Sequence, residues 1–226
     1  DPFEVKNILK YWALSEKQDF HVIPTDTISI SIDKDAVLRS GIMLPDSIRH
    51  LKGEDLKNAI PDKIYISLKD MRILTKVDML MLEMLANCNW ERPLYMAISV
   101  GEVSKLKFDH YFVQEGLAFR FTPFDYKKWG NVKGDNNYAI DVERLYENVM
   151  NRYKYGGLDT PGLYLDETTL RTCYYHRRLF AQLAKELIRQ GDNTRARKVL
   201  TYAEQAVPAY NVPEIYESGS FDIAKA

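Results

Sequence analysis

The stretch MLANCNWERPLYMAIS, residues 84–99, carries the pattern that decides the fold. Leading into it, apolar residues recur at the three- and four-residue spacing of a helix: Val77, Leu80, Met81, Met84 and Leu85. A second apolar run, Leu94–Val100, predicts a buried strand. The intervening segment, Asn87–Pro93, contains two Asn, one Trp and one Arg. A polar segment therefore joins a predicted helix to a predicted strand.

Three more segments predict strands. Thr27–Asp33 and Lys63–Leu68 alternate polar and apolar residues with a period of two, which is typical of half-buried strands. Leu117–Thr122 is expected to form another strand. The polar region between Asp33 and Pro61 has no clear period, although Ile48–Ile60 is compatible with one or two short helical turns.

Two helices are predicted in this first part of the chain. Pro2–Leu14 carries an apolar stripe, and Asp1 is a suitable N-cap for it. The spacing Thr75-x-x-Asp78 is that of a capping box and predicts the start of the helix that runs to Ala86.

The order of these elements indicates the fold class. A strand at 63–68, a helix and a strand at 94–100 favour a right-handed crossover between parallel strands, unless one strand belongs to another sheet. We predict an α/β (α+β) chain, in which a small mixed-sheet α/β sandwich domain precedes an all-helical, tetratricopeptide-like hairpin region. Because residues 127–138 are rich in Gly and Asn, the predicted domains are 1–130 (α/β), 131–139 (linker) and 140–226 (helical).

The C-terminal part contains a pattern that resembles one tetratricopeptide unit. The pattern is Phe180-x-x-Leu183-Ala184-x-x-Leu187, Gly191, Ala196-x-x-x-Leu200-x-x-Ala203 and Pro208. Its small residues allow two antiparallel helices to approach closely, its glycine allows the turn, and its proline ends the second helix. A further helix is expected from Ser220, and we expect the chain to be truncated within a longer repeat array.

Composition excludes several classes of protein. With 31 basic and 32 acidic residues, the chain has no net field that attracts a phosphate backbone, so we expect no nucleic-acid partner. The longest apolar stretch, Met79–Ala86, is interrupted by Glu83 and is far shorter than the roughly 18 residues of a spanning helix. The chain opens on Asp1-Pro2 without a signal peptide, and we expect it to be a fragment of a larger protein.

No nucleotide-binding, nucleophile-elbow or zinc-protease motif occurs in the sequence. Four histidines lack ligand spacing, so neither a metal site nor a cofactor is expected: His21, His50, His110 and His176. Cys88 and Cys173 are predicted to be buried thiols, with a single disulfide as the alternative in an oxidising compartment. The carboxylates that could act as acid and base are Asp125, Asp141, and Asp166 with Glu167, although Asp166 or a neighbour also suits a helix N-cap.

Three short motifs carry a resemblance to a known family: Asn89-Trp-x-Arg-Pro93, Glu115-Gly-Leu-Ala118 and Tyr164-Leu-Asp-Glu167. The chain resembles the soluble C-terminal portion of a family of bacterial multi-pass membrane proteins, which looks related to protein O-mannosyltransferases. The resemblance implies a non-catalytic region on the extracytoplasmic (periplasmic) side of the inner membrane. It also implies that the membrane domain of the same polypeptide is a partner and that the catalytic acid lies outside this chain. An acceptor protein or a glycan is the other partner to consider.

The candidate binding residues are Asn87, Asn89, Trp90, Arg92, Tyr164 and Arg171. In the functional interpretation, Trp90 offers a flat apolar face to a sugar ring, while Asn89 and Arg92 supply hydrogen bonds. In the structural interpretation, which we favour, an Asn ends the helix in a left-handed conformation, Trp90 packs, and Arg92 pairs with a carboxylate. Clustered tyrosines could line a groove or pack between helices. Arg171, Arg177 and Arg178 are expected to pair with Asp159, Asp166 or Glu167.

The second functional hypothesis is a protein–protein interaction module that uses the helical repeats. A free-standing hydrolase would need a convergent pair of carboxylates, which the sequence does not display.

Overall fold

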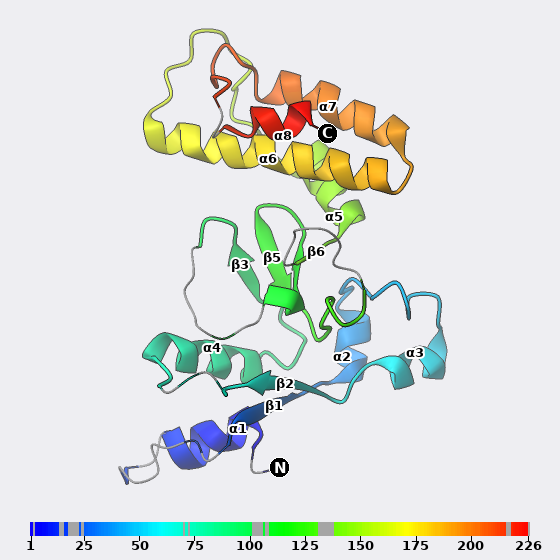
Figure 1. Cartoon of the computed structure of the whole chain (residues 1–226), viewed down its shortest axis with the longest axis vertical. Helices are drawn as coiled ribbons and strands as arrows, with labels where there is room; N and C mark the ends of the chain where they lie inside the picture. The colour runs from blue at the N-terminus through cyan, green and yellow to red at the C-terminus, as the bar shows by residue number, and fades with distance from the viewer. Residues whose placement is uncertain are drawn as a thin grey trace. The chain divides into compact units, whose positions relative to one another are not determined.

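A computed structural model covers the chain (Figure 1). It describes residues 1, 3–13, 16–17, 23, 25–69, 71, 73–100, 106, 109–130, 138–215 and 218–225. These residues form two compact units, 1–113 with 119–139 and 114–118 with 140–226. The predicted mixture of helices and sheets is confirmed. The proposed domain limits stay a prediction, and residues 131–137 of the predicted linker lie outside the described residues.

The first unit contains a two-stranded antiparallel sheet. Strand β1 (Thr27–Ser31) pairs with β2 (Lys63–Ser67), and the pairing joins Thr27 to Ser67 and Ser31 to Lys63. Four alternating isoleucines are buried, namely Ile28, Ile30, Ile64 and Ile66. Both strands were predicted from the alternation of polar and apolar residues. Alternation places every second side chain on the face that packs against the core.

The N-terminal helix is shorter than predicted. Helix α1 (Val5–Ile8) continues into the π-helical turn η1 (Leu9–Ala13), and Glu4 occupies the N-cap position. The Asp1 carboxylate instead accepts the Phe3 backbone N–H at 2.9 Å and pairs with Lys63 at 2.6 Å. Pro2, Leu14 and the side chain of Trp12, which the prediction included, lie outside the described part.

Two short helices occupy the region that the sequence left unassigned. Helix α2 (Lys34–Arg39) begins at Asp33, whose carboxylate accepts the Ala36 N–H at 2.9 Å. Helix α3 (Gly53–Ala59) follows and falls within the range expected to contain helical turns. Both helices lie between β1 and β2 in the order of the chain.

Helix α4 (Lys76–Asn87) starts with the predicted capping box, in which Thr75 and Asp78 each bond the other's backbone N–H. Its predicted apolar face is only partly correct, because the buried stripe includes Leu82, Leu85 and Ala86. The exposed fractions of Val77, Leu80 and Met84 are 40%, 63% and 55%. The two candidate stripes are adjacent on the helix, and the neighbouring elements, rather than the local spacing, decide which is covered.

The strand that follows α4 differs from its prediction. Strand β3 (Tyr95–Ala97) has three residues, and Tyr95 and Ala97 are exposed rather than buried. A four-stranded sheet has the order β3, β5 (Ala118–Phe121), β4 (Phe112–Gln114) and β6 (Ala139–Ile140). The short turn η3 (Asp109–Tyr111) precedes β4.

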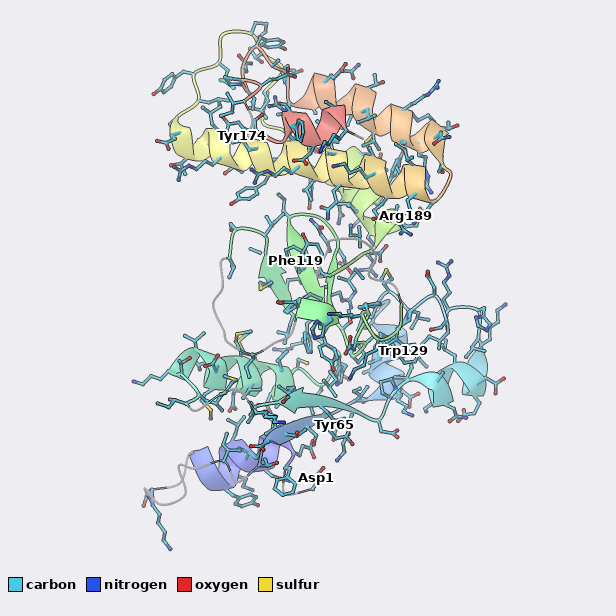
Figure 2. The ribbon with its side chains drawn as sticks, viewed as in Figure 1. Asp1, Tyr65, Phe119, Trp129, Tyr174 and Arg189 are labelled. Carbon is cyan, nitrogen blue, oxygen red and sulfur yellow. The ribbon has the colours of Figure 1, made fainter. Side chains whose placement is uncertain are left out.

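The favoured parallel crossover is not formed, and the alternative stated with it holds, because β2 and β3 belong to different sheets. Strand β3 is an edge strand, and Tyr95 and Ala97, which share one face of it, are both exposed. The central strand β5 carries the buried Phe119, labelled in Figure 2, and the buried Phe121. Tyr65 of β2, also labelled in Figure 2, is 64% exposed.

The second unit is mainly helical. Helix α5 (Val142–Glu147) starts at the predicted cap Asp141 and continues as the π-helical turn η4 (Asn148–Arg152). Helices α6 (Glu167–Arg189) and α7 (Asn193–Ala206) form the predicted antiparallel hairpin, and α8 (Ser220–Ala224) packs against α6 (Figure 1).

Small buried residues on α6 and α7 explain the close approach of the hairpin. Ala184, Ala196 and Ala203 are at most 2% exposed, and Gly191 turns the chain with a φ of 82°. The helix α7 ends two residues before Pro208. The assignment of this hairpin as a tetratricopeptide unit stays a prediction.

The predicted pairing of Arg177 with a carboxylate is wrong. Its guanidinium is buried in α6 and donates to the carbonyl oxygens of Val207, Val212 and Pro213 at 3.1, 2.7 and 3.2 Å, and to Ser220 Oγ at 3.1 Å. Burial lowers the pKa of Arg177, although the group remains a cation. One buried side chain thus ties residues 207–213 and Ser220 to α6.

Candidate functional site

The polar segment after α4 contains two consecutive residues in the left-handed conformation. Asn87 ends the helix, and its amide donates to the Glu83 carbonyl and carboxylate at 2.9 and 3.1 Å. Asn89 and Trp90 then have φ angles of 49° and 62°. Asn tolerates this conformation, whereas a bulky residue in it is an outlier that costs roughly 1–3 kcal/mol. The prediction that Asn87 or Asn89 adopts a left-handed conformation at the helix end is met by Asn89, and Trp90, which was not predicted to do so, adopts it as well.

The side chain of Trp90 is held from two directions. Its indole Nε1 donates to the Ser31 carbonyl oxygen at 3.0 Å, and its ring stacks on Phe121 with 5.8 Å between centroids and 19° between planes. Trp90 is 5% exposed. These contacts agree with the structural interpretation of Trp90 as a packing residue.

A cavity of about 240 Å³ lies beside this turn, entirely within the first unit. Its walls come from the start of α1, from β1 and from the end of α4. The polar side chains on its wall include Glu4, Lys6, Asp33 and Asn89. Lys6 Nζ donates to Asn89 Oδ1 at 3.1 Å, so α1 and the turn are linked directly across this site. Trp90 also lines the cavity.

Arg92 does not share this cavity. It is exposed and lines a separate space of about 10 Å³ together with Cys88, Trp90 and Phe121. Within the described residues no carboxylate forms an ion pair with Arg92, so the predicted pair is not found. The expected group of Asn89, Trp90 and Arg92 is therefore divided, because Asn89 lines the larger cavity, Arg92 lines the smaller space, and only Trp90 lines both.

The second motif, Glu115-Gly-Leu-Ala118, belongs to the second unit, where α5 and η4 hold it. The hydroxyl of Tyr153 accepts the Leu117 N–H at 2.9 Å, and the Asn148 amide donates to the Glu115 carbonyl at 2.6 Å. Gly116 has a φ of 153°, and a Cβ there would collide with the Tyr153 hydroxyl. This close approach explains why the motif contains a glycine.

The carboxylates of Glu115 and Asp141 both form ion pairs with Arg144 in this unit. Arg144 lies 3.1 Å from the buried Glu115 carboxylate and 3.5 Å from Asp141, whose carboxylate also accepts the Arg144 backbone N–H at 3.0 Å. Burial raises the pKa of Asp141, and the neighbouring carboxylate of Glu115 adds to this shift. Sequence reasoning missed Glu115 and Arg144 as partners. The spacing of three residues between Asp141 and Arg144 was the available signal.

The remaining predicted binding residues, Tyr164 and Arg171, belong to the second unit, whereas the Asn89 turn belongs to the first. Tyr164 is 89% exposed. Arg171 forms the expected ion pair with Glu167 at 2.5 Å. Asp166 is the N-cap of α6 and accepts from the Thr168 and Thr169 N–H groups, so the interpretation of Asp166 as a cap is confirmed.

The two thiols and His176 are packed against other side chains in the described part of the chain. Cys88 and Cys173 are free and buried, and burial raises the pKa of both. The prediction of buried thiols is thereby confirmed. His176 packs between the rings of Tyr153 and Tyr155, whereas His21 lies outside the described residues. Among the residues that are described, no three His, Cys, Asp or Glu side chains gather as a metal site would require.

Among the described helices, none combines the length and the apolar character that crossing a bilayer requires.

Comparison with known proteins identifies the family. Residues 4–143 match the family model of the TMEM260-associated domain 2, and the match includes the Asn89 turn and the Glu115–Ala118 motif. Neither a curated protein nor a solved structure matches the chain. Because the match covers more than half of its length, the chain belongs to the TMEM260-associated domain 2 family.

Proposed function

We propose that this chain is a non-catalytic, extracytoplasmic region of a membrane-bound protein glycosyltransferase-like protein of the O-mannosyltransferase kind. It positions the acceptor or stabilises the membrane domain of the same polypeptide. The observation that carries the proposal is the match of residues 4–143 to a domain named for its association with TMEM260. The periplasmic location and the O-mannosyltransferase relationship come from the resemblance of the three sequence motifs.

The surroundings of the acidic residues support a non-catalytic role. Asp141 and Asp166 bond backbone N–H groups at helix starts, and Glu115 is paired with Arg144. An acid–base pair for sugar transfer would need carboxylates that face a ligand instead. These three therefore serve helix capping and ion pairing in the second unit.

Sugar transfer from a lipid-linked donor tests this proposal. We expect membranes that contain the whole parent protein to glycosylate an acceptor, and the isolated chain to transfer no sugar. Deleting the region from the parent should reduce transfer or the amount of membrane protein. Transfer by the isolated chain, or full transfer and normal protein levels after its deletion, would contradict the proposal.

The alternative is a protein–protein interaction module that uses the helical hairpin. It is favoured by exposed apolar residues on and near the helices of the second unit, namely Tyr164, Ile188, Tyr210, Ile215 and Phe221. A pulldown of the purified membrane domain, with the whole chain and with a chain that ends at Lys127, distinguishes the two. Equal retention by both chains would rule out the helical surface.

A further inference from the structure

We infer that the cavity beside the Asn89–Trp90 turn binds one pyranose ring of a neutral glycan. This inference rests on the proposed function, since it names the ligand that the non-catalytic region would hold. It starts from the backbone of Trp90, whose φ of 62° suits glycine far better than a bulky residue. An unfavourable conformation at the wall of a cavity is a reason to look for a function there.

The size of the cavity limits the ligand. Its volume of about 240 Å³ greatly exceeds the roughly 30 Å³ that one water occupies in the liquid. It is smaller than the pockets of about 300–1,000 Å³ that enclose drug-sized ligands. A ligand of one six-membered ring therefore fits, whereas a nucleotide or a folded peptide segment does not.

The polar groups on the wall indicate hydroxyl groups on the ligand. Lys6 is a donor and the carboxylate of Glu4 is an acceptor, and Asp33, whose Oδ1 caps α2, retains Oδ2 as an acceptor. Asn89 Oδ1 accepts from Lys6, and within the described residues the Nδ2 of Asn89 donates no hydrogen bond. One cation and two carboxylates leave the wall with a net negative charge, which disfavours an anionic ligand. A neutral ring whose hydroxyls both donate and accept satisfies all four side chains.

The rest of the wall is apolar. Val5, Ile30 and Ala86 contribute aliphatic surface, and Trp90, of which 5% is exposed, also lines the cavity. Pyranose rings present C–H groups on one face and hydroxyls around the edge, which matches a wall of apolar residues next to polar ones. Arg92 is excluded from this site because it lines the separate, smaller space.

Titration of the ¹⁵N-labelled chain with methyl hexopyranosides of the gluco, galacto and manno series tests the site. We expect at least one of them to shift the Trp90 indole N–H signal with a Kd on the order of 1 mM. A Trp90→Phe variant assigns that signal among the three tryptophans. Glycerol and acetate serve as probes that lack the ring. The absence of a shift with every hexoside, or an equal shift with glycerol, would overturn the inference.

Two variants keep the test independent of folding. Asn89→Gly removes the amide at a position whose φ of 49° suits glycine, so the fold is retained and binding should weaken at least tenfold. Lys6→Met removes a donor from the wall and should also weaken binding, whereas Lys10→Met on the same helical segment, outside the cavity, should not. Equal affinity of all three variants would contradict the site.

The two proposals can fail separately. If the hexosides bind but deleting the region leaves transfer and protein levels unchanged, the proposed function is wrong and the site stands. If the deletion abolishes transfer while no hexoside binds, only the site is wrong.

Discussion

The indole Nε1 of Trp90 donates a hydrogen bond of 3.0 Å to the backbone carbonyl of Ser31, which lies 59 residues earlier in the chain. This bond connects the turn after α4 to the end of β1, while Phe121 stacks on the ring. The unfavourable backbone conformation of Trp90 persists because both contacts position its side chain.

The hydrogen bond can be tested by Trp90→Phe. The variant keeps an aromatic ring against Phe121 but leaves the Ser31 carbonyl without its donor, which should cost about 1–3 kcal/mol of unfolding free energy. Urea denaturation monitored by circular dichroism measures this loss. Unchanged stability would mean that the bond contributes nothing to the fold.

The glycine of the second motif can be tested by Gly116→Ala, with Gly53→Ala as the matched control. Gly53 has a φ of 58° and open space around it, so its variant should lose only about 1–2 kcal/mol from backbone strain. Gly116→Ala adds a collision with the Tyr153 hydroxyl and should cost about 3 kcal/mol or more. Adding Tyr153→Phe should recover part of that loss in a double-mutant cycle. Simple additivity would contradict the collision.

The buried guanidinium can be tested by Arg177→Met. Three carbonyl groups and Ser220 lose their donor, so we expect a loss of about 3–5 kcal/mol. Hydrogen exchange should quicken first in residues 207–215 and 218–225. Arg171→Met, on the same helix but in an exposed pair with Glu167, should change stability by no more than about 0.5 kcal/mol. Equal effects of both substitutions would contradict this role for Arg177.

The pH dependence of stability tests His176. Burial lowers the pKa of His176 below its ordinary value of 6.5, so the unfolded chain binds this proton more readily than the folded chain does. Its contribution to stability is therefore complete above about pH 6.5 and decreases as the pH falls below that value. His176→Phe should flatten the decrease in the urea midpoint below pH 6.5, and exposed His50→Gln should not. The same decrease in both variants would contradict the assignment.

The observed orientation of α4 is tested by two leucines. Leu82→Ala should cost about 2–5 kcal/mol, because Leu82 is 2% exposed. Leu80→Ala, at a position 63% exposed, should remain within about 0.5 kcal/mol once helix propensity is considered. Thermal denaturation measures both values, and a larger loss at Leu80 would restore the orientation predicted from the sequence.

Local signals were reliable where a few adjacent residues make the structure. The capping box of Thr75 and Asp78, the caps Asp141 and Asp166 and the strands β1 and β2 all formed as predicted. A cap is completed within about one helical turn, and alternation follows from the geometry of an extended chain. The caps need no distant residues, and the alternation can be recognised within each strand, although the pairing itself joins segments that α2 and α3 separate.

The candidate site was only partly predictable, because several of its residues are far apart in the sequence. Asn89 and Trp90 stand out in the sequence as a polar interruption, but Lys6, Glu4 and Asp33 reach the cavity from segments far away in the chain. Neither Ser31 as the acceptor for Trp90 nor the carbonyl partners of Arg177 could be recognised, because backbone acceptors leave no signal in the sequence.

By itself, the sequence determined the mixed fold class, the helical hairpin after residue 166 and the polar turn at Asn87–Pro93. Only the tertiary structure decided which face of α4 is buried, that β2 and β3 belong to different sheets, and that Arg92 lies outside the cavity of Asn89. Local geometry restricts each segment to a few conformations, whereas burial and strand pairing depend on which distant segments cover it.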